Sequence, residues 1–291
     1  MPFDRITERR MPGWLFAALG VPLLLATALL VGRALTGAPP PAPVAAAPAA
    51  GPSTPARSTT EPVPPAAPAP PDLPVVTYDP APGGFPADPA PADTRPLREG
   101  ARPNGKVAAY DAPGGRPLAF LAPTISDVRL TVPIVQRRAG WTAVLLPSAN
   151  RTIAWLPAGG WTTVALRDQI VVQRRTHRLT WLRDGRAVHT WPVSLGMPGQ
   201  LTPLGRTFVL GRTQPPQAVY GGVDIFALGA VPDDPDAVPT GLRGAHIGLH
   251  SWQNDDTLGE DVTNGCIRLT RSAQRQLLAA LAPGTSFVVL P

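Results

Sequence analysis

The sequence predicts a mainly β protein that carries one helix near its C-terminus. From Lys106 onward, short runs of β-branched and aromatic residues alternate with turn residues at intervals of about 8–12 residues, a pattern typical of sandwiches and barrels. The Asp184-Gly185 dipeptide lies between two such runs and indicates a tight hairpin. Only residues 270–281 place apolar side chains at helical spacing, and Pro283-Gly284 follows them as a stop signal.

Each predicted element rests on this local pattern. The expected strands cover residues 107–110, 117–120, 130–135, 141–146, 152–156, 170–173, 177–182, 187–193, 207–210, 246–250 and 286–290. The helix is expected to use Thr270 or Ser272 as its N-cap and to bury one face, made by Ala273, Leu277, Leu278 and Leu281.

The first 33 residues predict a membrane anchor. The uncharged run 14–32 has 19 residues, which as a helix span roughly 28 Å, close to the ~30 Å core of a bilayer. Three arginines precede the run and only Arg33 follows it directly, so the positive-inside rule places the N-terminus in the cytoplasm. We expect a cytoplasmic segment at 1–10, a signal anchor at 11–33 and an extracytoplasmic remainder. The alternative is a signal peptide cleaved near Thr36-Gly37-Ala38.

A linker is expected after the anchor, over residues 34–103. Residues 39–103 contain 21 prolines in 65 residues and show no hydrophobic periodicity that could build a core. This composition favours a disordered spacer with extended polyproline-like stretches. A proline-rich recognition segment is the alternative.

Residues 104–160 are expected to form a small β module. Its aromatic strand at 140–144, followed by a second at 153–157, resembles bacterial SH3-like domains of cell-wall proteins.

Composition excludes several kinds of site. Cys266 is the only cysteine of the 291 residues, so neither an internal disulfide nor a Cys-only zinc site is possible within the chain. The net charge of +6 is scattered, without the basic stripe of a nucleic-acid binder. If 246–249 is a strand, His246 and His250 lie roughly 13 Å apart, too far to share a zinc ion. We expect no nucleic acid, metal or cofactor.

A histidine and a cysteine near the C-terminus carry the main chemical signal. Fifteen residues separate His250 from Cys266. A thiol needs a neighbouring imidazole or positive field to become a nucleophile at neutral pH, and His250 is the candidate base. Gly265 would allow a tight turn in which the amides of Gly265 and Cys266 point at an oxyanion. This pattern predicts acyl transfer, although a lone cysteine is most often an inert buried side chain.

At these residues the sequence resembles the YkuD-type L,D-transpeptidase catalytic domain. The matching stretches are 192–196, 201–208, 247–251, 262–269 and 281–289, in the family's order, over about 125 residues. The resemblance implies a β-sandwich over 161–291 with one helix near the active site. It also implies that Cys266 is the nucleophile, that His250 is its base, and that the backbone carbonyl of Ser251 holds the imidazole. Asn264 replaces the family's second histidine and cannot accept a proton, which leaves it a role in orienting substrate.

The resemblance also implies substrate contacts. Arg268 could hold a substrate carboxylate by a bidentate contact, or make a structural ion pair instead. Residues 211–244 are expected to be largely irregular and to form a lid, with Tyr220 and Trp252 as walls of the cleft.

The implied function is that of a membrane-anchored peptidoglycan L,D-transpeptidase in a bacterial envelope, with its catalytic domain on the cell-wall side. Cys266 would attack a tetrapeptide donor at its third stem residue and release D-Ala, and a diamino acid of a second stem peptide would resolve the thioester as a 3→3 crosslink. Carbapenems would acylate Cys266. The alternatives are an L,D-carboxypeptidase, in which water is the acceptor, and a non-catalytic protein that binds the cell wall.

Overall fold

The computed structural model describes residues 62–214, 220 and 222–291. The predicted cytoplasmic segment, the membrane anchor and the first part of the linker lie outside these residues. Among the residues that are described, no helix is long and apolar enough to cross a membrane.

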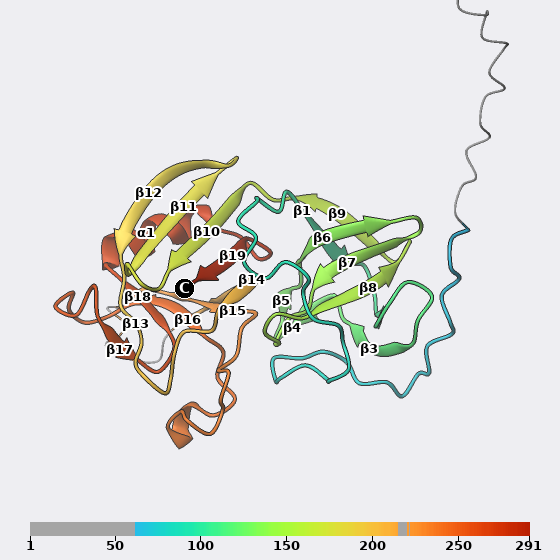
Figure 1. Cartoon of the computed structure of the whole chain (residues 1–291), viewed down its shortest axis with the longest axis horizontal. Coiled ribbons are helices and arrows are strands. Elements are labelled where there is room, and N and C mark those ends of the chain that lie inside the picture. Colours follow the sequence, from blue (N-terminus) through green and yellow to red (C-terminus); the bar gives the residue numbers. More distant parts are fainter. Residues whose placement is uncertain (1–61, 215–219, 221) are drawn as a thin grey trace, which may run out of the picture. The chain divides into compact units, whose positions relative to one another are not determined.

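The N-terminal module (residues 62–165) is built on a seven-stranded antiparallel sheet, drawn mostly in green in Figure 1. The strand order is β3-β2-β8-β7-β6-β1-β9. The strands are β1 (Glu99–Pro103), β2 (Val107–Tyr110), β3 (Pro117–Leu121), β6 (Val132–Arg138), β7 (Trp141–Leu145), β8 (Ile153–Pro157) and β9 (Trp161–Ala165), while β4 (Thr124–Ile125) and β5 (Val128–Arg129) pair as a separate hairpin. All five side chains of β7 are buried, so the sheet is covered on both faces there.

The C-terminal module (residues 166–291) is built on an eight-stranded sheet with the order β12-β11-β10-β19-β14-β15-β16-β18. Its strands are β10 (Asp168–Gln173), β11 (Arg178–Arg183), β12 (Arg186–Pro192), β14 (Gly205–Thr213), β15 (Ile225–Leu228), β16 (Gly248–Ser251), β18 (Ile267–Leu269) and β19 (Ser286–Leu290). The pair β13 (Leu195–Gly196) and β17 (Asp261–Thr263), the 3-10 helix η2 (Thr240–Leu242) and the helix α1 (Arg271–Ala280) complete it.

One core fills the C-terminal module. Ile170 of β10 and Ile267 of β18 stand near opposite ends of the strand order, yet both belong to the same buried cluster. The two ends of this sheet therefore share one core, and a single hydrogen-bonded sheet stands where a β-sandwich was expected. The chain is mainly β with one described α-helix, as predicted.

The helix and the hairpin follow local signals. The Thr270 hydroxyl oxygen accepts from the Ala273 N–H at 3.1 Å and caps α1, so the cap is Thr270 and not Ser272. Ala273, Leu277 and Leu281 are buried as expected. Asp184 and Gly185 both have positive φ, as the two-residue turn between β11 and β12 requires.

The predicted boundaries of the N-terminal module are wrong at both ends. Strand β1 begins at Glu99, inside the predicted linker, and β9 begins at Trp161, inside the predicted catalytic domain, because β1 and β9 pair with each other along their full length. The boundary between the N-terminal and the C-terminal module lies near Leu166. Its resemblance to SH3-like domains stays a prediction.

Residues 62–98, also predicted as disordered linker, lie against the N-terminal module. The Val76 N–H donates to the Phe120 carbonyl at 2.9 Å, and the Phe120 N–H donates to the Pro74 carbonyl at 2.8 Å. The Val76 side chain is buried. Residues 62–98 contain few apolar residues, so no hydrophobic periodicity predicted this packing. Backbone hydrogen bonds and a few buried side chains nevertheless hold the segment in place.

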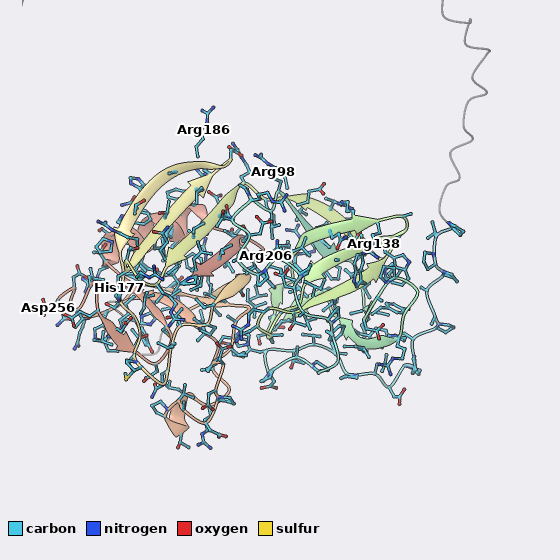
Figure 2. All side chains as sticks on the ribbon, viewed as in Figure 1. Arg98, Arg138, His177, Arg186, Arg206 and Asp256 are labelled. Carbon is cyan, nitrogen blue, oxygen red and sulfur yellow. The ribbon has the colours of Figure 1, made fainter. Side chains whose placement is uncertain are left out.

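The two modules share side chains of strand β14. Phe208 and Leu210 pack into the core of the N-terminal module, whereas Val209 packs into the core of the C-terminal module. Arg206, labelled in Figure 2, makes a buried ion pair with Asp88 of the preceding segment. Because a buried charge without a partner is costly, this pair ties residues 62–98 to the C-terminal module.

Candidate active site

Parallel pairing of β16 and β18 brings the predicted histidine and cysteine together. Leu249 stands opposite Ile267, and His250 stands opposite Arg268. Leu249 and Ile267 point into the core. Since side chains alternate along a strand, Gly248, His250 and Arg268 face the other side of the sheet. Cys266, directly before β18, lies on this same side, next to Gly248.

The Cys266 thiol is held beside the backbone of Gly248. The Cys266 residue is partly exposed, and its Sγ accepts from the Gly248 N–H at 3.3 Å. Burial raises the pKa of the thiol, while the Gly248 N–H and the positive charge of Arg268 act in the opposite direction. The resting side chain is therefore a protonated thiol at neutral pH.

The His250 imidazole is buried and held in one orientation. Its Nδ1–H donates to the Ser251 carbonyl oxygen at 2.8 Å, in the tautomer that leaves Nε2 as a proton acceptor. The pKa of His250 is lowered to about 4, chiefly by burial and also by the Arg268 charge, while the Ser251 contact acts in the opposite direction. A β-carbon built on Gly248 would lie 3.4 Å from His250 Cδ2 and 3.5 Å from Cys266 Sγ. The imidazole and the thiol therefore flank the same glycine.

The amide of Gly265 is not available for an oxyanion, contrary to the prediction. Gly265 has a φ of +100°, and its N–H donates to the Thr263 hydroxyl at 3.2 Å. That hydroxyl in turn donates to the Cys266 carbonyl at 2.5 Å. The Thr263 side chain therefore closes the turn before Cys266. The Cys266 N–H makes no hydrogen bond within the described part of the chain, and it remains the candidate oxyanion donor.

Three of the predicted substrate-binding residues surround the imidazole. The ring centroid of Tyr220 lies 4.9 Å from that of His250 and 5.5 Å from that of Trp252, in edge-to-face geometry. The Arg268 guanidinium carbon lies 3.9 Å from the centre of the Trp252 ring. The Ser251 hydroxyl donates to the Tyr220 carbonyl at 2.7 Å, which connects this group of residues to β16. These residues bury and desolvate the imidazole, which explains its lowered pKa.

Asn264 lies apart from this aromatic group, in a cleft that reaches Cys266. One cavity of about 30 Å³ is lined by Cys266, Asn264 and Val238, and a second of about 160 Å³ shares Asn264 and Val238 and extends to Gln200. Sequence reasoning missed Gln200 and Val238, because irregular segments distant in the sequence carry them and no motif marks them.

The segment 211–244 is less irregular than predicted. Strand β15 lies within it and pairs with β14 on one side and β16 on the other. It therefore connects the strand of His250 to the centre of the sheet. The cleft wall comes from the residues after this strand, among them Pro232, Asp233 and Val238.

The N-terminal module holds this wall. The Asn150 side chain donates to the Val231 carbonyl at 2.7 Å and accepts from the Val231 N–H at 3.1 Å. Arg151 pairs with Asp233 at 2.6 Å and donates to the Leu204 carbonyl at 2.9 Å. One turn of the N-terminal module thus holds the segment that contains Asp233 of the cleft wall and also binds the Leu204 carbonyl.

His246 takes a structural position. Its Nδ1 contacts the Leu228 carbonyl, its Nε2 contacts the Tyr78 carbonyl, and its ring stacks on Tyr78 with centroids 4.0 Å apart. Both ring nitrogens therefore contact the backbone. No group of three His, Cys, Asp or Glu side chains within the described ranges is arranged to hold a metal ion.

Several known proteins are similar to part of this chain. YqjB of Bacillus subtilis strain 168, named as an L,D-transpeptidase, is 27% identical over 124 residues, which are 41% of this chain and 69% of YqjB. YkuD of Bacillus licheniformis, also named as an L,D-transpeptidase, is 27% identical over 129 residues. These residues are 44% of this chain and 68% of the length of that YkuD. A solved structure described as an L,D-transpeptidase from Mycobacterium smegmatis is 16% identical and has a TM-score of 0.36, covering 55% of this chain and 82% of its own.

A family model covers most of the C-terminal module. The model described as YkuD, the L,D-transpeptidase catalytic domain, matches residues 167–289, a range that contains both His250 and Cys266. Residues 167–289 of this chain are therefore similar to the L,D-transpeptidase catalytic domain of the YkuD type.

Proposed function

We propose that this protein is a cysteine-dependent L,D-transpeptidase that forms 3→3 crosslinks between peptidoglycan stem peptides. The observation that supports this most directly is the pairing of Cys266 with a neutral imidazole across Gly248, with the Nδ1–H of that imidazole fixed by Ser251. A neutral imidazole in this tautomer can take a proton from the thiol as the thiol attacks. Activation thus occurs during attack and requires no preformed ion pair.

The first half-reaction forms the thioester. As His250 Nε2 takes the thiol proton, Cys266 Sγ attacks the carbonyl carbon that joins the third stem residue to D-Ala. The Cys266 N–H donates to the oxyanion of the tetrahedral intermediate. The carbon–nitrogen bond then breaks, and D-Ala leaves with the proton that His250 returns to its amine. The donor peptide remains bound to Cys266 through a thioester.

The second half-reaction transfers the donor to its acceptor. The side-chain amine of a diamino acid in a second stem peptide attacks the thioester carbonyl carbon, and His250 accepts one of its protons. The carbon–sulfur bond breaks, and the proton passes to Cys266 Sγ, which regenerates the thiol. Water in place of the amine would give the carboxypeptidase reaction by the same steps.

The cleft beside Asn264 is the proposed binding site for the donor peptide. It ends at Cys266 and contains the side chains of Gln200 and Asn264, which can hydrogen-bond an extended peptide. Asn264 would orient the peptide without exchanging protons. The proposed setting is the cell-wall side of a bacterial membrane, reached through the anchor predicted at residues 11–33.

A non-catalytic protein that binds the cell wall is the second candidate. Two observations favour it: burial raises the pKa of Cys266, and the Gly265 amide is engaged by Thr263. This candidate and the transpeptidase make opposite predictions about a covalent adduct.

The test is intact-protein mass spectrometry of the full chain with a carbapenem and with a disaccharide-tetrapeptide. We expect one acyl group per chain, and release of D-Ala from the tetrapeptide. Cys266→Ala should abolish the adduct, and His250→Ala should slow its formation on the order of 100-fold. His189→Ala, which changes an exposed histidine, is the matched control and should react as the unmodified chain does. A folded, unmodified chain that forms no adduct and releases no D-Ala would overturn the proposal.

A further inference from the structure

The N-terminal module carries an aromatic groove that the active site does not use. Tyr110 of β2 and Trp141 of β7 meet edge to face, with ring centroids 5.1 Å apart. Both side chains are almost fully buried, yet each has a polar tip, the phenol hydroxyl and the indole N–H. We refer to Tyr110 and Trp141, with Gly114 and Gly140 beside them, as the aromatic groove.

A proline-rich stretch of the same chain lies in this groove. The Trp141 Nε1–H donates to the Pro64 carbonyl at 2.8 Å, and the Tyr110 hydroxyl donates to the Ala67 carbonyl at 2.6 Å. The two acceptors are three residues apart, which is one turn of a polyproline II helix. Successive turns of such a helix place every third carbonyl on one side, so the spacing of the two donors matches that conformation.

The shape of the groove fits the stretch closely. A β-carbon on Gly114 would lie 2.6 Å from the Pro64 β-carbon, and one on Gly140 would lie 2.2 Å from Val63 Cγ1. Any side chain at either glycine would therefore collide with the stretch.

The stretch is held as a ligand is held, and not as part of a core. The side chains of residues 62–68 are exposed, with Val63 51% accessible, whereas Val76 further along is buried. Its contacts run through backbone carbonyls, which a polyproline II helix leaves free of internal hydrogen bonds. Aromatic grooves with indole and phenol donors bind proline-rich peptides in this way, because the peptide is already extended and loses little entropy on binding.

The groove also continues beyond the bound stretch. A cavity of about 360 Å³ extends from Gly140 and Trp141 to Trp161, with Arg137 and Arg138 on its rim. Figure 2 labels Arg138, whose guanidinium carbon lies 5.1 Å from the centre of the Trp155 ring. The aromatic surface is thus longer than the two hydrogen bonds alone require.

We propose that the aromatic groove is a receptor for proline-rich peptide in the polyproline II conformation, and that its ligand is the chain's own segment 62–68. Through this contact the folded part of the chain includes residues from 62 onward. The linker was predicted to continue to residue 103, more than 40 residues further along. This site is independent of the transpeptidase activity, since neither donor belongs to the catalytic domain.

The test uses the full chain with Pro62, Pro64, Pro65 and Pro68 all changed to Gly, which removes the extended conformation and keeps the groove. A synthetic peptide with the sequence of residues 62–71 is titrated into it, with the Trp141 indole N–H signal as the readout. We expect saturable binding with a Kd in the micromolar to millimolar range. The unmodified chain should bind the peptide at least about tenfold more weakly, because its own segment competes at high effective concentration. Tyr110→Phe in the substituted chain should weaken binding about fivefold, by loss of one hydrogen bond.

Controls and contradicting outcomes are built into the same experiment. The Trp181 indole N–H donates to Asp168 in the C-terminal module, away from the groove, and should show no change, so it reports on the fold. If a folded, substituted chain fails to bind the peptide, or binds a Gly-Ser peptide of equal length as well, the groove is not a receptor. If the unmodified chain binds the peptide as tightly as the substituted one, the segment is not its ligand.

A second measurement applies if the substituted chain does not fold. In the unmodified chain, hydrogen exchange of the Trp141 indole N–H should be slow, and Tyr110→Phe should accelerate it while leaving exchange of the Trp181 indole unchanged. Unaltered exchange at Trp141 in this variant would contradict the proposal.

Discussion

At the residue scale, the chemistry of the site depends on how little water reaches His250. Tyr220 and Trp252 cover the ring, and the Arg268 charge stands nearby, so the imidazolium form is disfavoured. The Ser251 carbonyl fixes the tautomer. A base that is neutral at every physiological pH can accept the thiol proton without first losing one of its own.

Stability in acid should reveal this burial. The pKa of His250 is about 4 in the folded protein, against 6.5 for an ordinary histidine. Between these two pH values the unfolded chain binds a proton that the folded chain does not, so the free energy of unfolding falls as the pH is lowered. We expect His250 to account for a loss of about 3 kcal/mol between pH 7.5 and pH 4.

Urea unfolding at several pH values would measure this loss. His250→Asn should remove it, so that the variant gains stability relative to the unmodified chain as the pH falls. His189→Asn is the control for an exposed histidine and should follow the unmodified chain. Parallel curves for all three proteins would contradict the assignment.

Much of the site at this scale could be predicted from the sequence. The prediction paired His250 with Cys266 and named Ser251, and the structure brings these residues together. The role given to the Gly265 amide was wrong, because the Thr263 hydroxyl takes its N–H. A glycine before a nucleophile indicates a turn, but the sequence does not say which neighbour accepts the hydrogen bond from that turn.

At the scale of elements, the parallel pair β16–β18 is what turns two distant residues into a site. The register of this parallel pair places Gly248 beside Cys266 and His250 beside Arg268. A shift of one strand by one residue would move its site residues to the core face. The backbone N–H of Gly248 also donates to the thiol. Gly248 therefore keeps the path between the imidazole and the sulfur open.

Gly248→Ala tests this element directly. The new methyl group would lie 3.4 Å from His250 Cδ2 and 3.5 Å from Cys266 Sγ, which are ordinary contact distances, so we expect the fold to persist. Because the methyl group would contact both the imidazole and the thiol, carbapenem acylation in the proposed mechanism should slow by at least about tenfold. Stopped-flow fluorescence or timed mass spectrometry would measure the rate. Gly105→Ala, at an open position, is the control, and equal rates for both variants would show that the gap at Gly248 is unimportant.

The prediction of elements succeeded where the signal was local. The capped helix, the Asp-Gly hairpin and the longer strands were all predicted from neighbouring residues. Strand β15 was missed because its four residues lie within a long stretch rich in Gly, Pro and Asp, and it exists as a strand only because β14 and β16 flank it.

At the scale of the whole molecule, the N-terminal module contacts the wall of the proposed substrate cleft. The turn that carries Asn150 and Arg151 contacts Asp233 of the cleft wall, the adjacent Val231 and the Leu204 carbonyl. The exposed ion pair of Arg151 and Asp233 contributes little by itself, whereas two of the hydrogen bonds of Asn150 hold both the N–H and the carbonyl of Val231. The module therefore positions the cleft wall.

Asn150→Ala should loosen that wall without touching the reacting groups. We expect the KM for a tetrapeptide donor to rise by about tenfold, with kcat within about threefold of its original value, since only binding depends on the wall. Steady-state release of D-Ala would measure both constants. Arg167→Ala removes an exposed ion pair with Asp184, away from the cleft, and serves as the control. An unchanged KM in Asn150→Ala would mean that the wall holds its position without the module.

The sequence by itself determined the class of fold, the helix near the C-terminus, the hairpin and the histidine–cysteine pair. These features depend on residues that are neighbours in the chain or on a motif with fixed spacing. Only the tertiary structure decided that residues 62–98 pack against the first module and that Asn150 supports a cleft more than 80 positions away. It also decided which aromatic side chains desolvate His250. These contacts join side chains to backbone groups of distant segments, and no local pattern of residues records which segments will meet.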